Sequence, residues 1–133
     1  MSKPHLAQRR TSAQNAVLNV LQHDDQSMSA QEIYAVLRSQ RTIGLATIYR
    51  ALDMLQKSGL IQHRVTLDGT TLYSLAERDR HYMTCLHCGQ SFPVDDCPVT
   101  ELEAKLQGSN AFKIYYHTLE FFGLCEPCTV GNE

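Results

Sequence analysis

Residues 46–75 read ATIYRALDMLQKSGLIQHRVTLDGTTLYSL, and this stretch decides the fold of the N-terminal half of the chain. Its first part has helical periodicity, because Ile48, Leu52 and Leu55 lie within roughly 60° of one another at about 100° per residue. We therefore predict a helix over about 46–58 whose apolar side faces a core. Gly59 follows at a position where helices commonly end.

The second part of the stretch has the pattern of a β-hairpin. Two β-rich runs, Leu60–Leu67 and Thr70–Leu75, are joined by Asp68-Gly69. An Asp-Gly pair favours a type I′ turn, because both central residues of that turn need a positive φ. The stretch therefore predicts a helix followed by a two-stranded hairpin.

Two further helices are predicted upstream. Thr11 or Ser12 can cap a helix that runs to about Gln22, and Ser29 with Glu32 forms a capping box before a second helix. Three helices followed by a hairpin make a winged helix-turn-helix, whose third helix usually reads the major groove of DNA. The alternative is a three-helix domain whose outward helix face is merely solvated.

The charge of the chain is unevenly distributed. The formal net charge is −2, which taken alone argues against a nucleic-acid partner. Residues 1–80 contain ten Lys and Arg against seven Asp and Glu, whereas residues 81–133 contain two against seven. The positive half holds the predicted winged helix and a basic arm ending at Arg9 and Arg10, which favours DNA as the partner of that half.

We predict an α+β fold in three segments: a winged-helix DNA-binding domain at 1–75, a hinge at 76–80 and a small α/β zinc-binding dimerisation domain at 81–133. In the last segment we expect a helix with Pro98 in its first turn that ends at 108–110, and a strand over Phe112–Phe122 with two apolar faces. One helix can cover only one of these faces, so a second copy of the chain is the expected cover of the other. The sequence thus predicts a homodimer.

The compartment follows from what the sequence lacks and from its cysteines. No apolar run approaches the ~18 residues of a membrane span, and the N-terminus has no apolar signal region. We therefore expect a cytoplasmic protein with no membrane partner. All five cysteines lie between Cys85 and Cys128, and in a reducing compartment clustered cysteines favour metal ligation over disulfides.

Two CxxC pairs define a metal site, Cys85 with Cys88 and Cys125 with Cys128. Each tight turn supplies two thiolates, and the two turns together complete the tetrahedral S₄ environment of a structural Zn²⁺. The alternative is a thioredoxin-like redox pair, which would make the protein a thiol–disulfide oxidoreductase but requires a single CxxC in a βαβ setting. We therefore expect structural zinc, no enzyme activity and no small-molecule substrate.

A second, regulatory metal site is predicted from the residues left over. Cys97, His63 and His81 together could hold a zinc ion that ties the wing to the C-terminal domain, since thiolate and imidazole suit zinc. For each of these residues the alternative is a surface or packing role. Other candidate ligands near the domain edges are Asp79, Glu101, Glu103 and His117.

Three motifs resemble the ferric uptake regulator (Fur) family: residues 44–52 (GLATIYRAL), 85–89 (CLHCG) and 117–125 (HTLEFFGLC). The resemblance implies a dimeric, metal-responsive transcription regulator that binds double-stranded operator DNA. By position it implies Tyr49 and Arg50 as the groove-reading pair, with Arg9 beside the minor groove. The remaining candidate DNA contacts are Thr47 at the edge of the same helix face, and Arg10 and Lys57 on phosphates.

The chain departs from the family around the regulatory site, since Ser74 and Thr100 stand where many members have a ligand. The thiolate of Cys97 favours the zinc uptake regulator branch, and control of zinc homeostasis genes, over iron or peroxide sensing. The resemblance also implies a second, non-thiolate site, and His81 cannot serve both sites fully. The residues of that second site would be Asp79, His81, His117 and Glu101 or Glu103.

Alternatives remain open inside and outside the family. Inside it, an iron- or peroxide-responsive regulator is the alternative. Outside it, the alternatives are a zinc-stapled thiol oxidoreductase and a zinc-stapled protein-interaction module that has no role in DNA binding.

Overall fold

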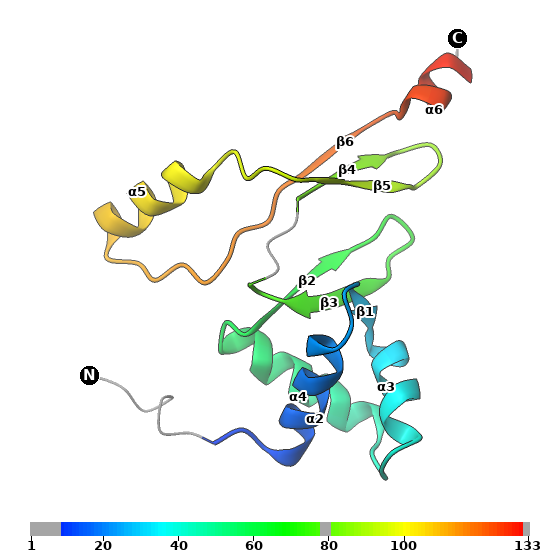
Figure 1. Ribbon diagram of the computed structural model, residues 1–133, viewed down its shortest axis with the longest axis vertical. Helices are drawn as coiled ribbons and strands as arrows, with labels where there is room; N and C mark the ends of the chain where they lie inside the picture. Colours follow the sequence, from blue (N-terminus) through cyan, green and yellow to red (C-terminus); the bar gives the residue numbers. More distant parts are fainter. Residues whose placement is uncertain (1–8, 78–80, 132–133) are drawn as a thin grey trace. The chain divides into compact units, whose positions relative to one another are not determined.

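A computed structural model describes residues 9–77 and 81–131 of the chain (Figure 1). The chain divides into two compact units, Met1–Glu77 and Arg78–Glu133. The division falls within the segment predicted as a hinge, residues 76–80. Ala76 is buried and its N–H donates to the carbonyl oxygen of Leu60 at 3.0 Å, so it belongs to the first unit.

The first unit is a winged helix-turn-helix, as predicted. Its helices are α2 (Ser12–Gln22), α3 (Ala30–Arg38) and α4 (Leu45–Lys57). They are followed by the hairpin of β2 (Ile61–Val65) and β3 (Thr71–Leu75), which are antiparallel and pair Ile61 with Leu75 and Val65 with Thr71. Gly69 in the hairpin turn has a φ of +89°, which a residue with a side chain rarely adopts.

Side-chain caps set the starts of the first two helices. Thr11 caps α2 and Ser29 caps α3, and in both cases the hydroxyl accepts from the backbone N–H three residues later. In return Gln14 and Glu32 accept hydrogen bonds from the N–H groups of the two caps. Both capping boxes satisfy backbone donors that a helix start leaves unpaired.

A short strand that the sequence did not predict completes the sheet of the first unit. This strand, β1 (Met28–Ser29), pairs antiparallel with β3, which places Met28 opposite Tyr73 and gives the sheet order β1-β3-β2. The capping residue of α3 is therefore also a strand residue, and the start of α3 is held beside the wing. The buried core of this unit includes Val17, Leu21, Ile33, Leu37, Ile48, Leu52, Leu55 and Ile61.

The second unit is a small α/β unit around a three-stranded sheet. Its strands are β4 (His81–Cys85), β5 (Ser91–Val94) and β6 (Glu120–Gly123), in the order β5-β4-β6. β4 is antiparallel to β5 and parallel to β6 (Figure 1). The parallel pairing places Cys85 opposite Gly123, which brings the first CxxC turn to the chain segment that leads into the second.

Three predictions for the second unit were wrong. The predicted strand over Phe112–Phe122 is limited to β6, and residues 112–119 form no strand among the described residues. The helix α5 (Thr100–Asn110) begins after Pro98, which was predicted to lie in its first turn, whereas its end at Asn110 agrees with the predicted end at 108–110. The residue that follows the helix, Ala111, has a φ of +50°. None of its side chains is buried, so α5 does not cover the sheet in the way the alternation of residues 112–122 suggested.

Candidate functional sites

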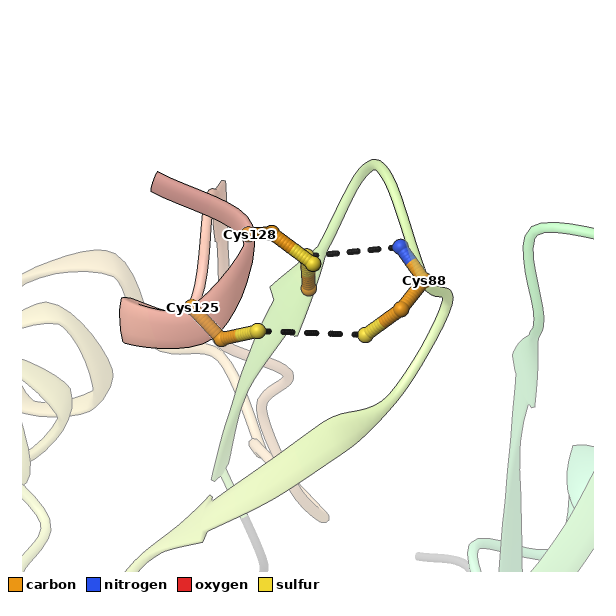
Figure 2. Close-up of side chains that lie close together, drawn as sticks. Cys88, Cys125 and Cys128 are labelled. Atoms are coloured by element: carbon orange, nitrogen blue, oxygen red, sulfur yellow. Dashed lines mark hydrogen bonds between the residues drawn. The ribbon is translucent and has the colours of Figure 1, made fainter. Parts of the chain in front are cut away.

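The four cysteines of the two CxxC pairs meet at one end of the second unit. Cys85 ends β4 and Cys88 lies in the following turn. Cys125 immediately precedes α6 (Glu126–Gly131), and Cys128 lies within it. Their Sγ atoms all lie within 4.8 Å of one another. Figure 2 shows the thiols of Cys88, Cys125 and Cys128 directed towards one space.

The spacing of these sulfur atoms fits a tetrahedral metal ion. A Zn–S bond of about 2.3 Å gives an S···S edge of about 3.8 Å in a regular tetrahedron. The Sγ atoms of Cys88 and Cys125 lie 3.8 Å apart. The turn that carries the first pair closes with a hydrogen bond from Gly89 N–H to the Cys85 carbonyl at 2.9 Å, and Gly89 has a φ of +79°.

The electrostatics of the four thiols also favour a bound cation. Backbone N–H groups of Cys125 and Cys88 point at the Cys85 sulfur and lower the pKa of that thiol to about 5. The neighbouring Cys125 thiol and burial raise the pKa of Cys128 to about 12. The site therefore stabilises one thiolate by itself, and four thiolates together require a positive ion at the centre.

A second cluster joins His81, Cys97 and His117. The ligand atoms of the three lie within 4.8 Å of one another. Nε2 of His117 is 3.2 Å from Nε2 of His81 and 3.3 Å from Sγ of Cys97. The residues come from the start of β4, the loop before α5 and the segment after α5, so three separate parts of the unit converge here.

The orientation of His117 is set by Glu103. Nδ1 of His117 lies 2.6 Å from Oε2 of Glu103 on α5. With its Nδ1–H given to this carboxylate, the imidazole presents the lone pair of Nε2 to Cys97 and His81. A carboxylate behind a histidine is the usual outer partner of a metal-binding imidazole.

His81 completes the cluster from a buried position. Its ring is 1% exposed and stacks on the ring of His117 with centroids 4.8 Å apart. Nδ1 of His81 has no hydrogen-bond partner among the described residues. Zn–N bonds of about 2.0–2.1 Å give an N···N edge of about 3.3–3.4 Å in a tetrahedron. The two imidazole nitrogens are therefore spaced to share one ion.

The Cys97 thiol is placed for ligation as well. The side chain of Thr100 and the backbone N–H of Val99, followed by His81, lower the pKa of this thiol to about 7. At neutral pH a thiol with this pKa exists to about one half as the thiolate that metals bind, a larger share than an ordinary cysteine offers.

The other predicted ligands of the regulatory site are not part of this cluster or fall outside the described residues. His63 is an exposed residue of β2 in the first unit, where its Nδ1 bonds Oε1 of Gln56 and its ring lies 6.3 Å from that of Tyr73. Glu101 is exposed on α5, and Asp79 falls outside the described residues. Sequence reasoning assigned Cys97 and His117 to different sites, and no signal in their spacing indicated that they meet.

The candidate DNA-binding residues belong to the first unit. Tyr49 is 45% exposed on α4, and the neighbouring Arg50 donates to the Thr47 hydroxyl at 3.1 Å. Lys57, at the other end of α4, pairs with Asp53 at 2.9 Å. Arg9 and Arg10 are exposed before α2, and Arg10 donates to the side chain of Asn15 at 2.9 Å.

Comparisons with known proteins agree with this arrangement. The sequence profile of the ferric uptake regulator family matches residues 6–122. The zinc uptake regulation protein of Mycobacterium tuberculosis is 34% identical over 122 residues, which cover 90% of this chain and 94% of that protein. The ferric uptake regulation protein of Neisseria meningitidis is 30% identical over 108 residues, which cover 80% of this chain and 75% of that protein.

A solved structure matches nearly the whole chain. The crystal structure of FurB from M. tuberculosis, a zinc uptake regulator, has 32% sequence identity and a TM-score of 0.51. The match covers 95% of this chain and 99% of that one. In the described part of the present chain, no helix has the length and apolar character needed to cross a bilayer.

Proposed function

The chain belongs to the ferric uptake regulator family, and on that premise we propose that it is a zinc-responsive transcription regulator. Membership makes it a metal-responsive transcription regulator. We propose further that it controls zinc homeostasis genes in the cytoplasm by binding operator DNA as a metal-loaded homodimer.

The ligand types in the cluster of His81, Cys97 and His117 are the observation that supports zinc as the sensed metal. One thiolate and two imidazoles suit zinc, whereas manganese and magnesium prefer oxygen ligands. Two imidazole nitrogens 3.2 Å apart and a sulfur 3.3 Å from one of them match the spacing that zinc requires. The 34% identical zinc uptake regulation protein supports the same choice, and the ferric uptake relatives support iron sensing as the alternative.

We propose Cys85, Cys88, Cys125 and Cys128 as ligands of a separate, structural zinc ion. A closed site of four thiolates leaves no position for a further ligand, so this zinc holds the fold and takes no part in sensing. It would join the end of β4 to α6, which lie 40 residues apart between Cys85 and Cys125.

The response to zinc follows from where the second cluster lies. Cys97 and His117 lie on either side of α5, and Glu103 is part of α5 itself. A zinc ion supplies a positive centre for the thiolate and the two imidazoles. A zinc ion bound by all three side chains would link Cys97 before α5 and His117 after α5 to His81 of β4. Zinc therefore favours the arrangement in which these three segments lie together. A ligand shifts an equilibrium only through its differential affinity, and a 99:1 reversal needs about 5.5 kcal/mol.

A second copy of this chain is the proposed cover for the exposed apolar side chains of the second unit. Met83, Phe121 and Phe122 are 49%, 52% and 54% exposed on β4 and β6. They line a pocket of about 260 Å³ together with Phe92 and Leu124. Apolar surface of this kind is typical of a subunit interface. A symmetric dimer would also give the two recognition helices the two-fold relation of a palindromic operator.

The experiment that tests the proposed function is DNA binding by the full chain at buffered free zinc, iron(II) and manganese(II). Metal content is measured in the same samples. We expect tight binding to operator-containing genomic fragments only with zinc, at two zinc ions per chain. Binding that responds to iron(II) at lower free concentration than to zinc would establish the iron-sensing alternative.

Arg50→Ala is expected to weaken operator binding by about 1–3 kcal/mol, because an arginine on a base edge or phosphate contributes about that much. Fluorescence anisotropy with the zinc-loaded protein measures the effect. Lys105→Ala, which removes the same charge from the exposed face of α5, serves as the control and should bind normally. An unchanged affinity in Arg50→Ala would mean that another face of the unit reads the DNA.

Glu103→Gln is expected to lower zinc affinity at the second cluster by about 10–100-fold, the usual effect of losing an outer carboxylate partner. The amide is a weaker acceptor for the Nδ1–H of His117. Competition with a fluorescent zinc chelator measures the affinity. Glu101→Gln, an exposed neighbour on α5, is the matched control. Equal losses in the two variants would show that only the local charge matters.

A further inference from the structure

The ligand types of the second cluster suit a further metal ion besides zinc. The cluster brings together one thiol sulfur, from Cys97, and one imidazole nitrogen from each of His81 and His117. Thiolate ligands select copper, zinc and iron–sulfur clusters, whereas imidazole ligands suit zinc, copper, iron and nickel. A single metal ion that both kinds of ligand favour is therefore zinc or copper.

The number of ligand atoms in this cluster points towards copper. The group has three members, and their ligand atoms all lie within 4.8 Å of one another. Structural zinc sites almost always have four protein ligands, as the four-cysteine cluster would provide. Two imidazoles and one thiolate in a trigonal arrangement are instead the ligand set that holds copper in electron-transfer proteins. The cluster thus has the composition of a copper site.

The position of His117 lets one ion contact all three ligands. Nε2 of His117 lies 3.2 Å from Nε2 of His81 and 3.3 Å from Sγ of Cys97. These two spacings are nearly equal, although the ligands come from segments far apart in the sequence. The carboxylate behind Nδ1 of His117 fixes the ring so that Nε2 faces the other two ligands, and it raises the basicity of the imidazole.

The charges at the cluster match a divalent ion. The thiolate of Cys97 contributes one negative charge, and the carboxylate of Glu103, 2.6 Å from Nδ1 of His117, contributes a second. His81 is 1% exposed, and Cys97 and His117 are partly buried. Since buried charges are unfavourable without compensation, the two negative charges favour an ion of charge +2. Copper(II) meets this condition as well as zinc does.

We propose that the cluster of His81, Cys97 and His117 binds copper(II) through the Cys97 thiolate and that copper(II) displaces zinc from it. This inference rests on the proposed function, because it takes the same cluster to be the regulatory metal site. The affinity of a given site generally rises from manganese to copper and is lower again for zinc. Copper therefore competes for the site to which the proposed regulator binds zinc, and the response to zinc depends on the supply of both metals.

The test adds one equivalent of copper(II) to the zinc-loaded full chain in the absence of oxygen. A thiolate bound to copper(II) gives an intense charge-transfer absorption in the visible range, which a zinc centre or a copper(II) centre with imidazole ligands alone lacks. We expect this absorption immediately after mixing, together with release of one zinc ion per chain. The released zinc is separated by gel filtration and measured by atomic emission.

Two variants assign the absorption to the cluster. Cys97→Ser should abolish it, and His117→Asn should lower copper affinity by at least about tenfold, since loss of an outer partner of a ligand already costs about 10–100-fold. His23→Asn is the matched control, because His23 is exposed in the first unit, where its Nδ1 lies 2.9 Å from the carbonyl oxygen of Asn19. This control should keep the absorption and the affinity of wild type.

The outcomes separate copper binding from the proposed function. An intense absorption that persists in Cys97→Ser would place copper on the four-cysteine cluster and overturn the assignment. A wild-type chain that keeps all its zinc and shows no such absorption would overturn copper binding while leaving a zinc-responsive regulator intact. A wild-type chain that takes up zinc only at the four-cysteine cluster would overturn the proposed zinc sensing, whatever the result with copper.

Discussion

Cys125→Ser is expected to unfold the second unit and to release its structural zinc, while the first unit stays folded. The reason lies in how little apolar surface this unit buries within one chain. Among the described residues 81–131, the buried side chains are His81, Thr84 and Cys85, whereas the apolar core cluster lies wholly in the first unit. A structural zinc site contributes an apparent folding free energy of about 10–16 kcal/mol, as much as a whole domain usually has.

The measurement combines zinc content with thermal unfolding followed by circular dichroism. We expect wild type to retain one zinc ion per chain after mild chelation, and Cys125→Ser to retain none and to lose the transition of the second unit. Cys97→Ser is the matched control, because it removes a thiol of the same unit outside the four-cysteine cluster. Identical unfolding of Cys125→Ser and wild type would mean that these cysteines do not hold a folding-linked metal.

Cys97→Ser is expected to raise the free zinc concentration needed for DNA binding by at least about 100-fold. Loss of an outer partner of a metal ligand already costs about 10–100-fold in affinity, so loss of the ligand itself should cost no less. The remaining imidazoles of His81 and His117 suit several metals, so the preference for zinc over manganese should also decrease. The structural zinc should remain bound.

Two measurements check the Cys97 prediction. DNA binding at buffered free zinc gives the response, and cobalt(II) substitution reports a thiolate ligand through its charge-transfer absorption. The absorption of the second cobalt ion should show one thiolate in wild type and none in Cys97→Ser. A variant that responds at the wild-type zinc concentration would show that Cys97 is no sensor ligand.

The first unit could be predicted almost completely because its signals are local. Helical spacing of Ile48, Leu52 and Leu55 predicted α4, and all three are buried. The capping box of Ser29 and Glu32 predicted the start of α3, and Asp68-Gly69 predicted the hairpin turn. Among the described elements of this unit, β1 was missed, because two residues carry no periodicity and their pairing with Tyr73 and Leu72 is distant in sequence.

The second unit was harder to predict because its order depends on contacts between distant segments. Alternating apolar residues over Phe112–Phe122 predicted one long strand, yet pairing to β4 begins only at Glu120. Strand pairing needs a partner strand at the right register, and alternation alone does not supply one.

The sequence by itself determined the winged helix-turn-helix, the division of charge between the two halves, and the two CxxC turns. The helices, the hairpin turn and the CxxC turns rest on residues that lie within one turn or one helix face of each other, and the division of charge is a count along the chain. Only the tertiary structure decided that the side chain of Cys97 contacts His117 beside His81, and that the carboxylate of Glu103 bonds the other ring nitrogen of His117. It also decided that β1, just before α3, pairs with β3 of the wing. These contacts join residues 14 to 45 positions apart, and their closure depends on sheet register and helix placement, which no local pattern of side chains encodes.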